Sequence, residues 1–168
     1  MPVIGKNPYA PEDVIIEIKY CGICGSDLHA WRKTSEKESG PLRPVVSGHE
    51  ISGVIYEIGE KVRGLEIGDR VVCEIVTFYC GNCANCRAGR VNICCNIPPR
   101  EQRAHYTTGG GFTKLIAWPA RHVHKLPDNI SSEEAVLMEP TAGSVHALLE
   151  RAKLSVGESV AILGPGPR

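Results

Sequence analysis

Alternating apolar and polar side chains mark short strands in the first 130 residues. In the segment VIIEIKY (14–20), Ile16, Ile18 and Tyr20 fall on one face of an extended chain and charged residues lie between them. The same kind of pattern recurs in three later segments, 51–59, 68–76 and 112–119. Short strands separated by turns rich in glycine and proline predict a mainly β fold, an irregular β-barrel, for this part of the chain.

The pattern changes after residue 130. Ser131 is followed three residues later by Glu134, which predicts a capping box at the start of a helix. We expect Pro140 to interrupt that helix and a second helix to follow, with apolar residues at spacings of three and four. The apolar run Val160–Leu163 then predicts a buried strand that ends at Gly164-Pro165-Gly166.

The length, composition and net charge of the chain limit the kinds of protein it can be. The 168 residues amount to one domain, or one domain and the start of another, and 42% of them are hydrophobic, enough for a sizeable core. Nineteen basic residues balance nineteen acidic ones, so neither nucleic acid nor a membrane surface is the expected partner. The first residues lack the apolar core of a secretory signal, and no apolar run could span a bilayer; we therefore expect a cytoplasmic protein.

A run of four cysteines is the most conspicuous candidate for chemistry. Cys80, Cys83, Cys86 and Cys94 have gaps of two, two and seven residues, which suit a tetrahedral zinc site. Four protein ligands leave no open position, so such a zinc would be structural and not catalytic. A pair of disulfides and a zinc-ribbon interaction module are the alternatives. Disulfides are disfavoured without an export signal, and no aromatic platform accompanies the nearby arginines.

A second group of candidate ligands is scattered along the chain. Cys24 lies in CGICGSDLH (21–29) and His49 in GHE (48–50), and a thiolate with an imidazole suits zinc. A third ligand must come from elsewhere. Glu139 is the candidate, because Pro140 pushes its backbone out of helical geometry and would let its side chain project from a broken helix.

These motifs occur in the order found in a known family. CGICGSDLH, GHE, GDRVV, the four-cysteine run, GGGFTKLI and MEP together resemble the zinc-dependent medium-chain dehydrogenases, which include alcohol, sorbitol and threonine dehydrogenases. The resemblance implies a GroES-like catalytic domain over residues 1–140, with a structural zinc lobe at 80–95. Residues 141–168 would form a linking helix and the first strand of a dinucleotide-binding Rossmann domain.

The same resemblance assigns the metal ligands. Cys24 and His49 would hold a catalytic zinc, and Glu50 would lie beside it and exchange with water as a ligand. Glu139 stands where the sorbitol- and threonine-dehydrogenase-like branch has a glutamate and alcohol dehydrogenases proper have a cysteine. The four cysteines match the structural zinc site, so two zincs are expected per chain.

The chemistry implied is hydride transfer from a secondary alcohol or polyol to NAD or NADP, with zinc as the Lewis acid. Ser26 would hydrogen-bond the substrate oxygen and pass its proton on, and His29 would exchange that proton with solvent. Asp27 would orient a ligand. Gly164 and Gly166 would open the glycine-rich turn that binds the cofactor.

The chain stops before a complete glycine-rich turn, so we expect a piece of a longer enzyme with little or no turnover alone, and a homo-oligomer when full length. The alternative is a non-catalytic zinc-binding interaction module of GroES-like fold, which predicts one zinc per chain instead of two. A metal-free relative similar to quinone reductases is a third possibility. The presence of Cys24, His49 and the four-cysteine run argues against it.

Overall fold

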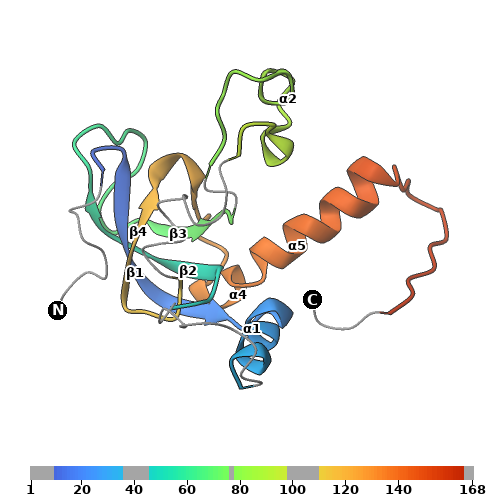
Figure 1. Cartoon of the computed structure of the whole chain (residues 1–168), viewed down its shortest axis with the longest axis horizontal. Coiled ribbons are helices and arrows are strands. Elements are labelled where there is room, and N and C mark those ends of the chain that lie inside the picture. Colours follow the sequence, from blue (N-terminus) through green and yellow to red (C-terminus); the bar gives the residue numbers. More distant parts are fainter. Residues whose placement is uncertain (1–9, 36–45, 76–77, 98–109, 165–168) are drawn as a thin grey trace.

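The computed structural model describes residues 10–35, 46–75, 78–97 and 110–164 (Figure 1). Five antiparallel strands form one sheet in the order β4-β1-β2-β3-β5. Their bounds are β1 Asp13–Gly22, β2 Glu50–Ile58, β3 Arg70–Cys73, β4 Leu115–Pro119 and β5 Val123–Lys125.

The connection between β4 and β5 explains why the sheet curls. These two strands form opposite edges of the sheet, yet only the short 3-10 helix η3, Ala120–His122, joins them. Five strands side by side in a flat sheet would separate the edges by about 19 Å, since neighbours lie about 4.8 Å apart. Three linking residues reach about 14 Å at most. The edges must therefore approach each other, as in a barrel.

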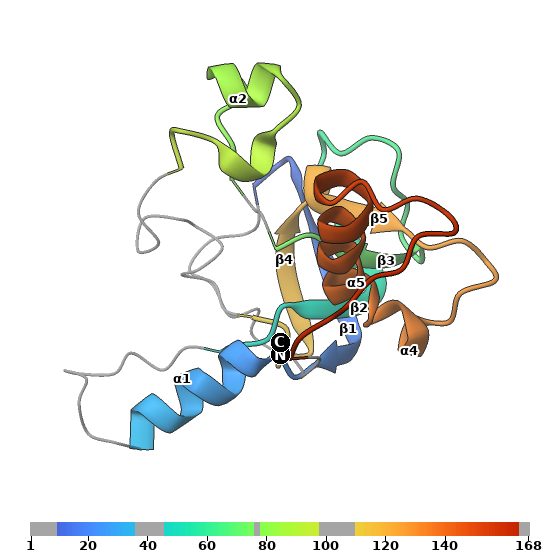
Figure 2. The same cartoon turned by 90° about the vertical axis from the view of Figure 1, so that its right-hand side faces the viewer.

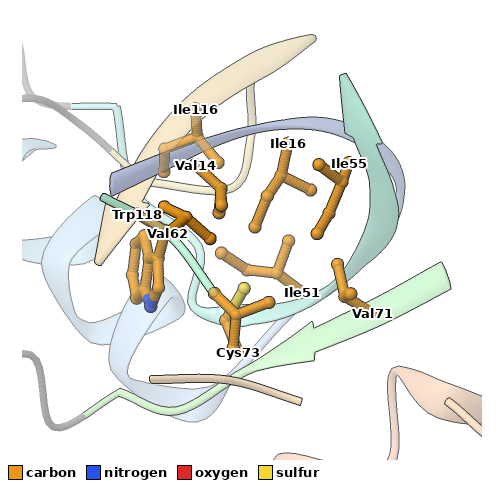
Figure 3. Close-up of a cluster of buried hydrophobic side chains, with 10 residues drawn as sticks. Val14, Ile16, Ile51, Ile55, Val62, Val71, Cys73, Ile116 and Trp118 are labelled. Carbon is orange, nitrogen blue, oxygen red and sulfur yellow. The ribbon is translucent and has the colours of Figure 1, made fainter. Parts of the chain in front are cut away.

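The inner side of the curled sheet holds the apolar core (Figure 3). Val14, Ile16 and Val71 are fully buried. They pack with side chains from other strands and from the loop after β2, namely Ile51, Ile55, Val62, Cys73, Ile116, Trp118 and Val123. The predicted strand segments thus supply the core, and the expected mainly β, barrel-like fold is confirmed.

Helices flank the sheet. They are α1 Gly25–Ser35, α2 Ala84–Arg87, the 3-10 helix η1 Val91–Ile93, α4 Ser132–Ala135, α5 Met138–Val145 and the π-helical segment η4 His146–Arg151. The lobe that contains α2 and η1 and the helix α1 project at opposite ends of the molecule (Figures 1 and 2). In the parts of the chain that the structure describes, no helix combines the length and apolarity needed to cross a membrane.

Around residue 140 the helical prediction is partly right. The capping box is confirmed, because the Ser131 hydroxyl accepts from the Glu134 backbone N–H at 3.1 Å and Glu134 accepts from the Ser131 N–H at 2.9 Å. The break, however, comes before Pro140 and not at it. α5 begins at Met138, so Pro140 lies in the first turn of a helix, where its missing N–H leaves no intrahelical bond unmade.

Two strand predictions need correction. Val160–Leu163 is not a strand, and Val160, Ile162 and Leu163 are exposed, because no described strand lies beside them to pair with. Tyr20, expected on the inner face with Ile16, is 45% exposed. The β1–β2 register shifts between Ile18 and Tyr20, and such a bulge breaks the strict alternation of faces.

Candidate metal sites

Cys24, His49 and Glu50 come together into what we call the Cys24 cluster. One ligand atom from each residue lies within 4.8 Å of the other two. Cys24 sits in the short connection between β1 and α1, and Glu50 is the first residue of β2. Because Gly22 pairs with Glu50 in the β1–β2 ladder, the sheet itself brings the two segments side by side.

Two residues next to the cluster fix its geometry. Gly22 leaves room for the Glu50 carboxylate, which a side chain at position 22 would strike. Asp27 accepts hydrogen bonds from the backbone N–H of Cys24 at 2.9 Å and of Gly48 at 3.2 Å. One carboxylate thus ties the segment that carries Cys24 to the segment that carries His49, which supports the orienting role expected for Asp27.

Glu139 lies near the cluster but outside the set of atoms within 4.8 Å. Its pKa is raised, mainly by burial and further by the negative charge of Glu50, while His49 opposes the shift. These interactions place the carboxyl group in the electrostatic surroundings of His49 and Glu50. It projects from the first turn of α5, a regular helix, rather than from a helix broken at Pro140.

The other predicted site residues are not part of the Cys24 cluster. Ser26 and His29 are exposed on α1, one turn apart, in the helix that starts directly after Cys24. Gly164 has a φ of 70°, a backbone conformation that favours glycine, at the end of the described chain. Gly166 lies outside the described residues.

The four-cysteine cluster (Cys80, Cys83, Cys86 and Cys94) is held within one lobe. Its four sulfur atoms lie within 4.8 Å of one another, and the Sγ atoms of Cys80 and Cys86 are 3.9 Å apart. Zn–S bonds of about 2.3 Å in a tetrahedron place sulfur atoms about 3.8 Å apart. The spacing therefore fits a zinc ion with four thiolate ligands.

Backbone N–H groups prepare these sulfur atoms for negative charge. The N–H of Cys83 donates to the sulfur of Cys80 at 3.3 Å, and the N–H of Cys86 donates to the sulfur of Cys83 at 3.5 Å. The latter bond is the largest cause that lowers the pKa of Cys83 to about 6. Burial instead raises the pKa of Cys86 to about 12, and a cation bound among the sulfur atoms would offset this cost of ionising the thiol. No disulfide joins any of the eight cysteines, all of which lie in the described residues, and this argues against the disulfide alternative.

Two features near these sites were missed at the sequence level. Cys21, expected only to be a small buried side chain, packs beside the Cys24 cluster. Burial, with the charges of Asp27 and Glu50, raises the pKa of its thiol to about 11. His122, given no role, is 1% exposed and bonds Glu74 through Nδ1 at 3.1 Å. No local spacing signals either arrangement, because both depend on strand pairing.

Comparison with known proteins adds independent information. Residues 10–128 match the family described as the alcohol dehydrogenase GroES-like domain. The chain is 41% identical over 160 residues to a probable D-xylulose reductase A of Aspergillus fumigatus, covering 94% of this chain and 42% of that protein. It is 39% identical over 167 residues to an L-threonine 3-dehydrogenase of Pseudoalteromonas atlantica, covering 99% of this chain and 46% of that enzyme.

A solved structure agrees with these matches. The alcohol dehydrogenase TADH from Thermus sp. ATN1 superposes with a TM-score of 0.78 at 28% identity, covering 99% of this chain and 47% of that one. The chain therefore spans less than half the length of the proteins it matches.

Proposed function

Because the chain belongs to the alcohol dehydrogenase GroES-like domain family, we propose that it carries the zinc-binding part of an NAD(P)-linked dehydrogenase of polyols or secondary alcohols. The observation that carries this proposal is the convergence of Cys24, His49 and Glu50. The names of the relatives, a D-xylulose reductase and an L-threonine 3-dehydrogenase, support a small hydroxylated substrate and a redox reaction. The substrate class, the cofactor, a homo-oligomeric state and a cytoplasmic location are part of the proposal for the whole protein.

In this proposal the Cys24 cluster holds the catalytic zinc, and the four-cysteine cluster holds the structural one. A thiolate, an imidazole and a carboxylate suit zinc, and three protein ligands leave a position open for substrate. Bound there, the zinc would supply positive charge that polarises the oxygen of the substrate alcohol or ketone.

The residues around the cluster would orient the ligands, stabilise the bound cation and transfer the substrate proton. Asp27 keeps Cys24 and the His49 segment in register through its two backbone hydrogen bonds. Glu139 would stabilise a bound cation and could join the ligands, since a nearby positive charge offsets the cost of ionising a half-buried carboxyl group. Ser26 would take the proton of the substrate hydroxyl, and His29 would exchange that proton with water. Their position one turn apart on α1 supports this order.

Hydride transfer requires a nicotinamide cofactor, for which Gly164 and Gly166 are the proposed contacts in this chain. The division of the chain into a catalytic domain over 1–140 and the start of a cofactor domain over 141–168 remains a prediction.

The test is steady-state oxidation of a panel of polyols and secondary alcohols by the whole protein, with NAD⁺ and with NADP⁺. We expect activity with at least one pair and its loss in Cys24→Ser, whereas Cys73→Ser, a change at a buried cysteine in the apolar core, retains it. A protein that is folded and zinc-loaded yet inactive across the panel would favour the non-catalytic interaction module. Equal activity in Cys24→Ser would contradict the assignment of the site.

A further inference from the structure

A third cysteine lies beside the Cys24 cluster and is not one of its ligand atoms. Cys21 precedes Cys24 by three residues, the same spacing that links neighbouring cysteines in the lobe. From this spacing alone, Cys21 would be predicted to be a metal ligand. The sulfur of Cys21, however, is not part of the group of ligand atoms formed by Cys24, His49 and Glu50. Its thiol instead donates to the carbonyl of Gly22 at 3.6 Å.

The sulfur of Cys21 occupies the space between two glycines from distant parts of the sequence. A Cβ atom on Gly48 would lie 2.8 Å from this sulfur, and so would a Cβ atom on Gly111. Non-bonded heavy atoms prefer separations of about 3.5–4.0 Å, so neither position tolerates a side chain while the sulfur is there. Gly48 also has a φ of 94°, which by itself favours glycine.

Hydrogen bonds join the same segments around the sulfur. The N–H of Gly111 donates to the carbonyl of Gly48 at 2.8 Å, and the N–H of Phe112 donates to the carbonyl of Ser47 at 3.0 Å. Cys21 itself faces Ile51 in the β1–β2 ladder, two residues beyond His49. The segment that ends at His49 is therefore bonded to the Gly111 segment, and the sulfur determines how closely both can approach β1.

We propose that Cys21 is a positioning residue that holds His49 at the correct place beside Cys24, by filling the space between Gly48 and Gly111. The inference rests on the proposed zinc site. Cys21 touches neither metal nor substrate in this account, and it acts through the backbone of Gly48.

Cobalt(II) titration into the Cys24 cluster tests the inference without enzyme turnover, in the 168-residue chain with zinc retained in the four-cysteine cluster. Thiolate and imidazole ligands give Co²⁺ visible absorption bands that report the geometry of the site. We expect Cys21→Ala to weaken Co²⁺ binding about tenfold, the lower end of what loss of a supporting residue costs a metal site, and to change the visible bands. The zinc of the four-cysteine cluster should stay bound.

Cys73→Ala is the matched control. Cys73 is also a buried cysteine, 4% exposed, but it packs in the apolar core and not against Gly48. This variant should lose stability and keep the Co²⁺ affinity and spectrum of the unaltered chain. Equal affinity and spectrum in Cys21→Ala would overturn the inference alone. Failure of the unaltered chain to bind Co²⁺ at the cluster would overturn the proposed zinc site, and the inference with it.

A double variant keeps the test informative if Cys21→Ala folds poorly. Gly111→Ala alone should weaken Co²⁺ binding, because its new methyl group would lie 2.8 Å from the sulfur of Cys21 and 2.9 Å from Cγ1 of Ile51. In Cys21→Ala/Gly111→Ala the contact with the sulfur is removed and the contact with Ile51 remains, so affinity should recover only in part. Losses that simply add in the double variant would contradict a shared packing site.

Discussion

Asp27 offers the sharpest test of how the Cys24 cluster is assembled. Its carboxylate accepts two backbone hydrogen bonds, from Cys24 at 2.9 Å and from Gly48 at 3.2 Å, and both are partly buried. Hydrogen bonds to a charged group contribute about 1.5–3 kcal/mol each, and the lower value suits partial exposure. Asp27→Ala should therefore reduce the free energy of unfolding by about 3 kcal/mol.

Asp27→Asn separates the two bonds. The amide oxygen can accept one of them, but the amide NH₂ group must then face the other N–H, so about half of the loss is expected. Since both bonds fix segments that carry proposed ligands, the two variants should also weaken metal binding at the Cys24 cluster, in the same order.

Urea unfolding and Co²⁺ titration, carried out on the same preparations, measure the two effects. Asp69→Ala is the control, because that carboxylate also accepts a backbone N–H, from Glu66 at 2.9 Å, and pairs with Lys125 at 2.5 Å, with neither partner in the Cys24 cluster. It should lower stability without weakening Co²⁺ binding. If Asp27→Ala lowered stability but bound Co²⁺ as tightly as Asp69→Ala does, the bridge would be structural only, and the reasoning would be refuted.

Three further predictions concern other parts of the chain. His122 and His124 hydrogen-bond Glu74 at 3.1 and 2.6 Å and lower its pKa; the resulting stability is present above the ordinary pKa of 4.5 and is lost as pH falls through the lower folded-state value. Unfolding curves from pH 7 to pH 3 should show this acid-side loss in the unaltered chain, and Glu74→Gln should abolish it. Ser131→Ala removes the capping box and should cost about 1 kcal/mol in urea unfolding; no loss would mean that α4 does not depend on its cap. Cys83→Ser should release the lobe zinc, whose binding is worth on the order of 10 kcal/mol in small zinc peptides, and should open residues 78–97 to protease, whereas equal protection with the metal lost would contradict a structural role.

The four-cysteine cluster could be predicted from sequence because its geometry is local. Cys80 to Cys94 lie within one short lobe, and α2 and the backbone N–H bonds between neighbouring cysteines determine their spacing. The Cys24 cluster was harder, because its residues meet only through β1–β2 pairing, Gly22 opposite Glu50. Motif order supplied that juxtaposition by resemblance, not by spacing.

What sequence analysis missed depends on tertiary pairing. The contact of Cys21 with Gly48 and Gly111 requires segments far apart in the sequence to meet, and no periodicity reports it. The apolar run Val160–Leu163 looked like a buried strand, but a strand exists only where a neighbour pairs with it. Glu139 was expected to leave a helix broken by Pro140, whereas proline fits the first turn that it occupies here.

Zinc content per chain tests the central claim most directly, measured by mass spectrometry of the metal in the purified chain, in Cys24→Ser and in Cys83→Ser. Two separate clusters predict two zincs in the unaltered chain and one in each variant, with the Cys24→Ser chain still folded. A single zinc in the unaltered chain, retained in Cys24→Ser, would contradict a metal site at Cys24, His49 and Glu50.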